Sequence, residues 1–215
     1  MKYLSVMVAK LFADPTKAAF VRPALLANGV EPEERIIVCS MGWQGYLALD
    51  KSLGDDRSGP RLYYHDSNLE IMSTSSEHER IKKWIASLVE VYFEEKEIEN
   101  MPRGQATMTL LESTGAEPDE SWCIGEEKQW PDIVLEIALT SGGLDKLQIY
   151  RRFSVPEVWI WRNDKLEVHA LRDDEYVRQT ASTILPGLDI ALIERCVAIP
   201  RWLEARREFR AGLKS

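Results

Sequence analysis

The sequence is poor in cysteine and histidine, and it has no long hydrophobic run. The three cysteines in 215 residues form neither a CxxC pair nor a regular disulfide framework, which predicts free thiols and a reducing, cytoplasmic setting. The three histidines, His65, His78 and His169, have no partner at zinc-ligand spacing, which argues against a zinc enzyme. No run approaches about 18 apolar residues, so we expect no membrane-spanning helix.

Several motifs of common enzyme classes are also missing. The chain has no G-x-x-x-x-G-K-[ST], no G-x-G-x-x-G after a strand and no G-x-S-x-G, which argues against nucleotide kinases, Rossmann oxidoreductases and α/β-hydrolases. Positive charge is scarce: 27 Lys and Arg against 35 Asp and Glu give a formal net charge of −8 and a pI of about 5.1. This balance argues against nucleic-acid binding through overall positive charge, but not against a nucleic-acid enzyme whose positive residues are local.

The composition is that of a globular protein with a substantial core. With 45% hydrophobic and 29% charged residues in 24.6 kDa, a single domain over residues 1–215 is expected. The patterns predict a hairpin at 61–72, a long amphipathic helix from residue 76, strands at 107–111, 120–124 and 132–138, a helix at 144–153, strands at 157–162, 165–171 and 175–180, and a helical tail from about 189. This order predicts a mixed α/β fold rather than a regular βαβ array.

Two carboxylates and a lysine form the candidate catalytic group. Asp119 follows Pro118 where a turn leads into a strand, and Glu136 lies within the most hydrophobic strand, where an unpaired carboxylate is costly. Their separation allows both to project from neighbouring strands at one end of a sheet, and Lys146 on the next helix could fold back over that end. Such a PD…E…K pattern suits a Mg²⁺-dependent phosphodiester hydrolase, because hard oxygen ligands bind the ion and a lysine can orient the water or stabilise charge on phosphorus.

Spacing alone also permits a structural interpretation, which is the more common outcome for such residues. In that interpretation Asp119 and Asp132 cap turns, and Glu136 pairs with Lys146. Asp132 is an alternative metal ligand, because it belongs to a second Pro-Asp pair and lies on the same face of the strand as Glu136. Its position one strand-length away, however, favours a residue that begins the strand. A glycosidase that uses the two carboxylates is a further, weaker alternative.

Five segments in fixed order, which include these residues, resemble a known family. They are Asn68–Ser73 (NLEIMS), Glu77–Lys82 (EHERIK), Gly115–Glu120 (GAEPDE), Pro131–Ile137 (PDIVLEI), and Tyr150 followed by Val155–Trp159 (VPEVW). The set is similar to the signature of the Uma-type endonuclease family, a former domain of unknown function in the PD-(D/E)xK, restriction-endonuclease-like superfamily. The ordered set is far more specific than any one segment.

The resemblance implies a restriction-endonuclease-like core over about residues 43–197, in which helices flank a central mixed sheet, with an added antiparallel meander and a helical tail over 198–215. It implies that Asp119 and Glu136 bind Mg²⁺, with Mn²⁺ as a substitute, and that Lys146 is the family's lysine on the following helix. The superfamily's ExK pattern has its lysine at position 138, which is Ala138 here, so Lys146 is interpreted as a migrated substitute. The implied function is DNA cleavage; a non-catalytic module that binds nucleic acid or protein is the alternative, since fold does not fix function.

The long helix near Ser76 adds two supporting residues. Counting back by helical turns places Glu77 and His78 on the inward face. The resemblance implies that this helix lies beside the active site, so either residue could hold a metal-bound water. A hydrogen-bonded histidine at the helix start is the structural alternative for His78. Glu70 alternates with apolar neighbours, and we expect it on the solvent face of its strand.

Positive residues gather on the long helix and in the tail. They are Arg80, Lys82 and Lys83 on the helix, and Arg201, Arg206, Arg207, Arg210 and Lys214 in the tail. Either group could contact DNA phosphates, although a solvated helix face is the more common explanation. Many nucleases cut two strands with two-fold symmetry, which favours a homodimer.

Overall fold

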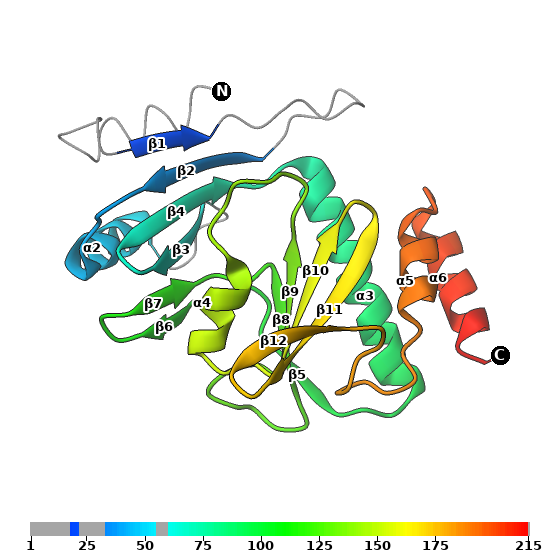
Figure 1. Ribbon diagram of the computed structural model, residues 1–215. Coiled ribbons are helices and arrows are strands. Elements are labelled where there is room, and N and C mark those ends of the chain that lie inside the picture. The colour runs from blue at the N-terminus through cyan, green and yellow to red at the C-terminus, as the bar shows by residue number, and fades with distance from the viewer. Residues whose placement is uncertain (1–17, 22–32, 55–59, 215) are drawn as a thin grey trace. The chain divides into compact units, whose positions relative to one another are not determined.

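The structure is a computed structural model that describes residues 18–21, 33–54 and 60–214. The described chain forms two compact units that alternate along the sequence. Unit 1 contains the residues up to Ser76, Thr107–Glu117 and Thr140–Arg152, and unit 2 contains Glu77–Ala106, Pro118–Leu139 and the chain from Phe153 onward. The expected mixed α/β class is confirmed, with one six-stranded sheet in each unit (Figure 1). The single domain over 1–215 also takes in residues outside the described ranges and stays a prediction.

The sheet of unit 1 is antiparallel throughout, in the order β1-β2-β4-β3-β7-β6. Its strands are β1 (Ala18–Val21), β2 (Glu34–Val38), β3 (Arg61–His65), β4 (Asn68–Ser73), β6 (Met108–Leu110) and β7 (Thr114–Ala116). The predicted hairpin is β3–β4, and its two turn residues, Asp66 and Ser67, have φ values of 45° and 60°. Positive φ at both positions is what a tight two-residue hairpin turn requires.

Different segments cover the two faces of this sheet. Helix α2 (Trp43–Leu53) packs on one face, where the rings of Trp43, Tyr46 and Tyr64 lie with centroids 5.0 to 5.4 Å apart. Since side chains alternate along a strand, Tyr63 and Glu70 point to the opposite face. There they meet the segment that carries helix α4 (Lys146–Arg152).

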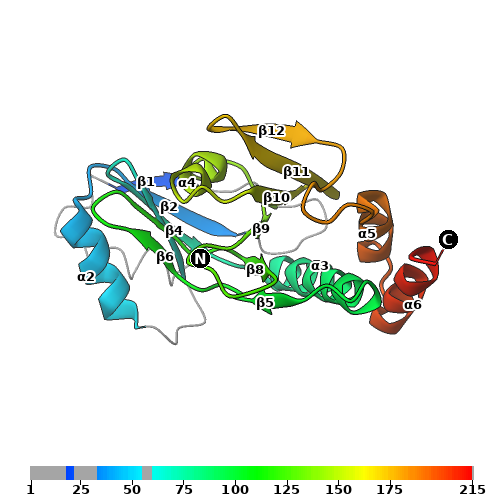
Figure 2. The same cartoon turned by 90° about the horizontal axis from the view of Figure 1, so that it is seen from below.

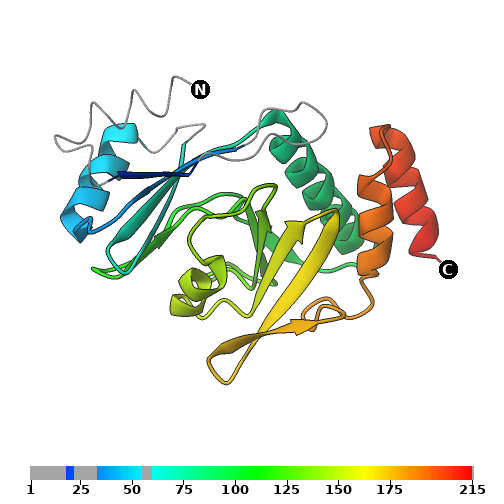
Figure 3. The ribbon, with the colours of Figure 1, turned by 45° about the horizontal axis from the view of Figure 1, so that its top comes forward.

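The sheet of unit 2 is mixed, in the order β12-β11-β10-β9-β8-β5. Its strands are β5 (Asn100–Pro102), β8 (Glu120–Ile124), β9 (Ile133–Ile137), β10 (Glu157–Arg162), β11 (Lys165–Arg172) and β12 (Glu175–Gln179). Strands β9 and β10 are parallel, and the other neighbours are antiparallel. The predicted meander is β10–β12, yellow to orange in Figure 3.

Three helices supply the other side of the core of unit 2. Helix α3 (Ser76–Glu95) lies against the sheet through its predicted apolar stripe, and Trp159 and Trp161 are buried in this core, at 0% and 2% exposure. The tail forms two helices, α5 (Ile190–Val197) and α6 (Trp202–Gly212), which lie side by side (Figure 2). Pro200 lies between them and keeps them separate, because proline cannot continue a helix.

The cysteines and the hydrophobicity of the helices bear on two of the expectations from the sequence. Cys39, Cys123 and Cys196 are free thiols, as predicted. In the described part of the chain, no helix combines the length and hydrophobicity needed to cross a bilayer.

Candidate active site

Strands β8 and β9 bring two predicted residues to the same end of the sheet in unit 2. Their antiparallel register ends with Glu120 opposite Leu135, and one further step places Asp119 opposite Glu136. The main-chain N–H of Ile137 donates a hydrogen bond of 2.7 Å to Oδ2 of Asp119, which ties the residue before β8 to the end of β9. Asp119 and Glu136 therefore occupy one rim of this sheet.

Both carboxylates are buried, with 1% exposure for Asp119 and 2% for Glu136. Ile133, Leu135 and Ile137 of β9 belong to the core beneath the helices, so alternation places Glu136 on the opposite face of the sheet. Adjacent buried carboxylates are costly in surroundings of low dielectric constant, and a bound cation would offset that cost.

The first turn of α3 places His78 beside Asp119. His78 is fully buried, and its Nε2 forms a hydrogen bond of 2.8 Å with Oδ1 of Asp119. Glu77 is only partly buried, and its two oxygens accept hydrogen bonds of 2.8 and 2.6 Å from Arg80. These bonds hold the pKa of Glu77 below its usual value. His78 thus contacts the candidate aspartate directly, whereas Glu77 stabilises the start of the helix that carries His78.

Asp132, the competing aspartate, lies at the other end of β9. Its Oδ2 accepts hydrogen bonds of 2.7 Å from the Ile124 N–H and from the Lys128 ammonium. Asp132 and Glu136 are four residues apart along an extended strand, which corresponds to about 13 Å. Asp132 therefore anchors the β8–β9 connection, as the structural interpretation has it, and it does not share a rim with Glu136.

Lys146, the predicted lysine, is the first residue of α4 in unit 1. Its ammonium lies 3.0 Å from Oε2 of Glu70 and 2.9 Å from the centroid of the Tyr63 ring. Glu70 is fully buried, so its expected place on a solvent face is wrong. The alternation in β4 identifies the two faces correctly, but the segment that carries α4 covers the second face as well.

Glu70 also accepts hydrogen bonds of 3.0 Å from Arg35 and 2.6 Å from the Leu144 N–H. Burial by itself would lower the pKa of Arg35, but the nearby carboxylates of Glu70 and Glu33 outweigh it and raise that pKa. The sequence carried a usable signal for this cluster. Glu70 lies between Leu69 and Ile71 in an otherwise apolar strand, which is unusual for a solvent-facing charge.

The donor set of unit 2 suits a small divalent cation. Among the described residues, no group of three or more His, Cys, Asp or Glu side chains is arranged to hold a metal ion. Mg²⁺ does not need such a cage, because it is commonly bound by one or two carboxylates and keeps several waters. The hard oxygens of Asp119 and Glu136 fit Mg²⁺ or Mn²⁺, and metal-binding carboxylates are themselves usually hydrogen-bonded, as Asp119 is.

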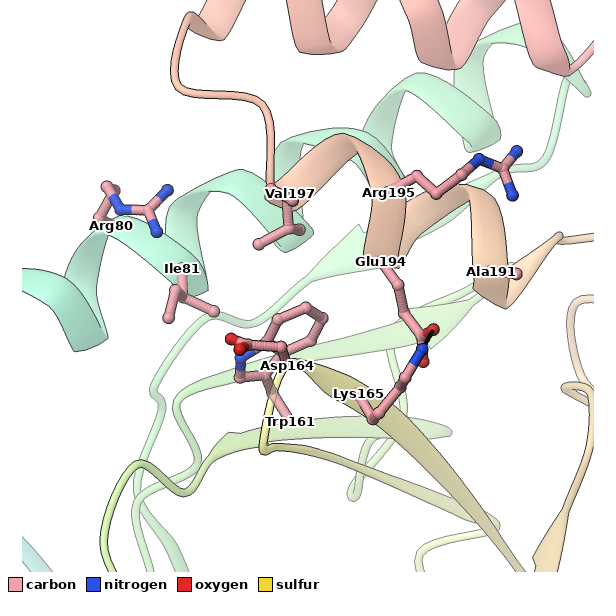
Figure 4. A pocket seen from close by; sticks show the side chains of 10 residues that line it. Arg80, Ile81, Trp161, Asp164, Lys165, Ala191, Glu194, Arg195 and Val197 are labelled. Atoms are coloured by element: carbon pink, nitrogen blue, oxygen red, sulfur yellow. Dashed lines mark hydrogen bonds and ion pairs between the residues drawn. The ribbon is translucent and has the colours of Figure 1, made fainter. Parts of the chain in front are cut away.

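A separate pocket of about 350 Å³ lies in unit 2 between α3, α5 and the β10–β11 turn (Figure 4). None of the predicted catalytic residues lines it. Glu194 accepts hydrogen bonds from the Lys165 ammonium and the Leu166 N–H, at 2.8 and 3.0 Å, and Arg80 is held by Glu77. Several polar groups that line this pocket therefore already form hydrogen bonds within the protein.

Comparison with known proteins identifies the family. The family model described as "Uma2: Putative restriction endonuclease" matches residues 43–204. The chain belongs to this family. A crystal structure of a protein from Anabaena variabilis, titled "a putative nuclease belonging to DUF820", is similar in fold with a TM-score of 0.51 and 13% identity, over 79% of this chain and 99% of that one. No curated protein matches the chain.

Membership in the Uma2 family confirms the resemblance on the five ordered segments, and the structural likeness confirms a restriction-endonuclease-like fold. The match runs from residue 43 to residue 204, which lies within α6. The Uma2 match includes Asp119, Glu136, Lys146, His78 and Glu77.

Proposed function

We propose that this Uma2 protein is an endonuclease that hydrolyses DNA phosphodiester bonds with a divalent cation, Mg²⁺ or its substitute Mn²⁺. The observation that carries the proposal is the position of two buried carboxylates, Asp119 and Glu136, at one end of β8 and β9 in a chain of a restriction-endonuclease family. When bound, the metal would neutralise phosphate charge and lower the pKa of a water molecule.

The side chains have distinct proposed roles. Asp119 and Glu136 supply the metal's oxygen ligands, while His78 and the Ile137 N–H each hold one oxygen of Asp119 and so fix the plane of that carboxylate. Lys146 orients the attacking water or stabilises charge on phosphorus, a role taken from the family pattern. Glu77 supports the site indirectly, because its pair with Arg80 secures the turn that bears His78.

The setting is part of the same proposal. The excess of negative charge favours weak, salt-sensitive association with DNA, which bound cations would strengthen. Three free thiols favour a reducing, cytoplasmic location. A homodimer would present two sites to two strands, and light scattering on the purified protein would then give twice the chain mass of 24.6 kDa.

Metal binding can be measured apart from turnover by calorimetric titration with Mn²⁺. We expect Glu136→Gln, which keeps the shape of the side chain but removes its charge, to weaken Mn²⁺ binding by more than about tenfold. Glu175→Gln, on the exposed strand β12, is the matched control and should bind Mn²⁺ as the wild type does. Equal affinity of wild type and Glu136→Gln would reject Glu136 as a ligand.

A further inference from the structure

Unit 1 contains a buried charged cluster that the proposed roles do not use beyond Lys146. Glu70 lies opposite Ile37 of β2 and Tyr63 of β3 in the strand register. Cross-strand partners point to the same face of a sheet, so the carboxylate of Glu70 and the ring of Tyr63 stand next to each other. The ammonium of Lys146 rests on both, 3.0 Å from the carboxylate and 2.9 Å from the ring centroid.

Arg35 holds the other oxygen of Glu70. Its guanidinium donates a hydrogen bond of 3.0 Å to Glu70 Oε1 and one of 2.8 Å to Glu33 Oε2, and these three side chains are 6%, 0% and 0% exposed. A buried ion pair seldom adds stability over well-packed apolar residues of similar volume, because desolvation consumes the Coulomb energy. Stability of the fold therefore gives little reason for a charged residue at position 70. The need to place the ammonium of Lys146 gives one.

The loop that leads into α4 is fastened to the same cluster. The Thr140 hydroxyl donates to Glu33 and accepts from Arg35 Nε, and the Leu144 N–H donates to Glu70 at 2.6 Å. A Cβ at Gly143 would collide with Arg35 and the Glu70 carboxylate, so only glycine allows the backbone to approach this closely. Glu70 thus holds Lys146 twice, through its ammonium and through the main chain just before α4.

We propose that Glu70 is a positioning residue for Lys146: its buried carboxylate, clamped by Arg35, fixes where the lysine's ammonium is presented. This inference rests on the proposed nuclease function. A lysine side chain is long and flexible, so its contribution at a reacting phosphate depends on how well its position is fixed beforehand. Glu70 acts through Lys146 and does not contact the DNA.

The first test compares two buried glutamates that share Arg35. Glu70→Gln keeps the size of the side chain but removes the ion pair with Lys146, and we expect kcat for metal-dependent DNA cleavage to fall by about 10- to 100-fold with little change in KM. Glu33→Gln also removes a carboxylate from Arg35 but leaves the Glu70–Lys146 ion pair in place, so its kcat should stay near the wild-type value. Faster deuterium exchange of the Leu144 amide in Glu70→Gln would report loss of the second tether.

A double-mutant cycle separates positioning from general structural support. If Glu70 acts through Lys146, adding Glu70→Gln to Lys146→Ala should slow cleavage no further. Wild type that fails to cleave would overturn the proposed function and this inference with it. Lys146→Ala that cleaves normally would overturn the proposed role of Lys146, and with it this inference, but not the nuclease function. If the wild type cleaves DNA and Lys146→Ala is impaired, two results would overturn the inference alone. One is a Glu70→Gln protein with wild-type kcat, and the other is a Glu70→Gln substitution that lowers kcat in the Lys146→Ala background as much as it does in the wild type.

If circular dichroism shows that Glu70→Gln does not fold, Glu70→Asp, whose carboxylate is withdrawn by one methylene, takes its place in the same cycle with the same criteria.

Discussion

Replacing Asp119 by asparagine is expected to lower DNA cleavage by about a thousandfold, which corresponds to roughly 4 kcal/mol of lost transition-state stabilisation. The substitution removes the negative charge that binds the metal but keeps the shape of the side chain. The amide oxygen can still accept the hydrogen bond from the Ile137 N–H, and the amide group can donate to neutral His78. The variant should therefore fold, and the loss should appear in the initial rate of plasmid cleavage.

Asp132→Asn is the matched control for this experiment. Asp132 also follows a proline at the start of a strand, and it also accepts a main-chain hydrogen bond of 2.7 Å, but it lies at the other end of β9. Its asparagine variant should cleave DNA at close to the wild-type rate. Comparable losses in both variants, or none in Asp119→Asn, would contradict the assignment of Asp119.

The largest effect on stability is expected from Glu157→Gln. Glu157 is fully buried on β10, and its two oxygens accept five hydrogen bonds, from Trp159 Nε1, the Ser182 and Thr183 hydroxyls, and the N–H groups of Thr183 and Ile184. In the glutamine variant an NH₂ group would replace one of the accepting oxygens and would face N–H and O–H donors. Buried donors left without an acceptor are costly. We expect the free energy of unfolding to fall by about 3 kcal/mol.

Urea denaturation followed by circular dichroism measures this loss. Glu167→Gln, on the neighbouring strand β11 and only partly buried, is the control; it pairs at the surface with Arg178 and should change the free energy of unfolding by less than about 1 kcal/mol. A Glu157→Gln protein as stable as wild type would show that this carboxylate does not anchor the Ser182–Leu185 segment.

Local patterns predicted most of the elements because each pattern has a direct physical cause. The apolar stripe of α3 predicts a helix on a core, and the apolar run of β9, interrupted only by Glu136, predicts a central covered strand; both occur. The short strands β5 and β7 were not predicted, since they contain Pro102 and Gly115, which have low strand propensity. A second complete sheet was not predicted either, because pairings such as His65 with Thr114 join residues far apart in sequence.

The candidate site was predictable where charge interrupts hydrophobic sequence next to a recognisable motif. That logic selected Asp119 and Glu136, which the structure brings to one rim, and His78, which contacts Asp119. The burial of Glu70 and Glu157 was not predicted, because the alternation of side chains along a strand indicates which way a side chain points but not whether a distant segment covers it. Both are fully buried by chain that comes much later in the sequence.

Cleavage of supercoiled, linear and single-stranded DNA by the folded wild-type protein tests the central claim most directly. We expect cleavage with Mg²⁺ or Mn²⁺, none after chelation with EDTA, and recovery when the ion is added back. Cleavage that persists in EDTA, or folded protein that cuts none of the three substrates with either ion, would contradict the claim that this chain is a metal-dependent endonuclease.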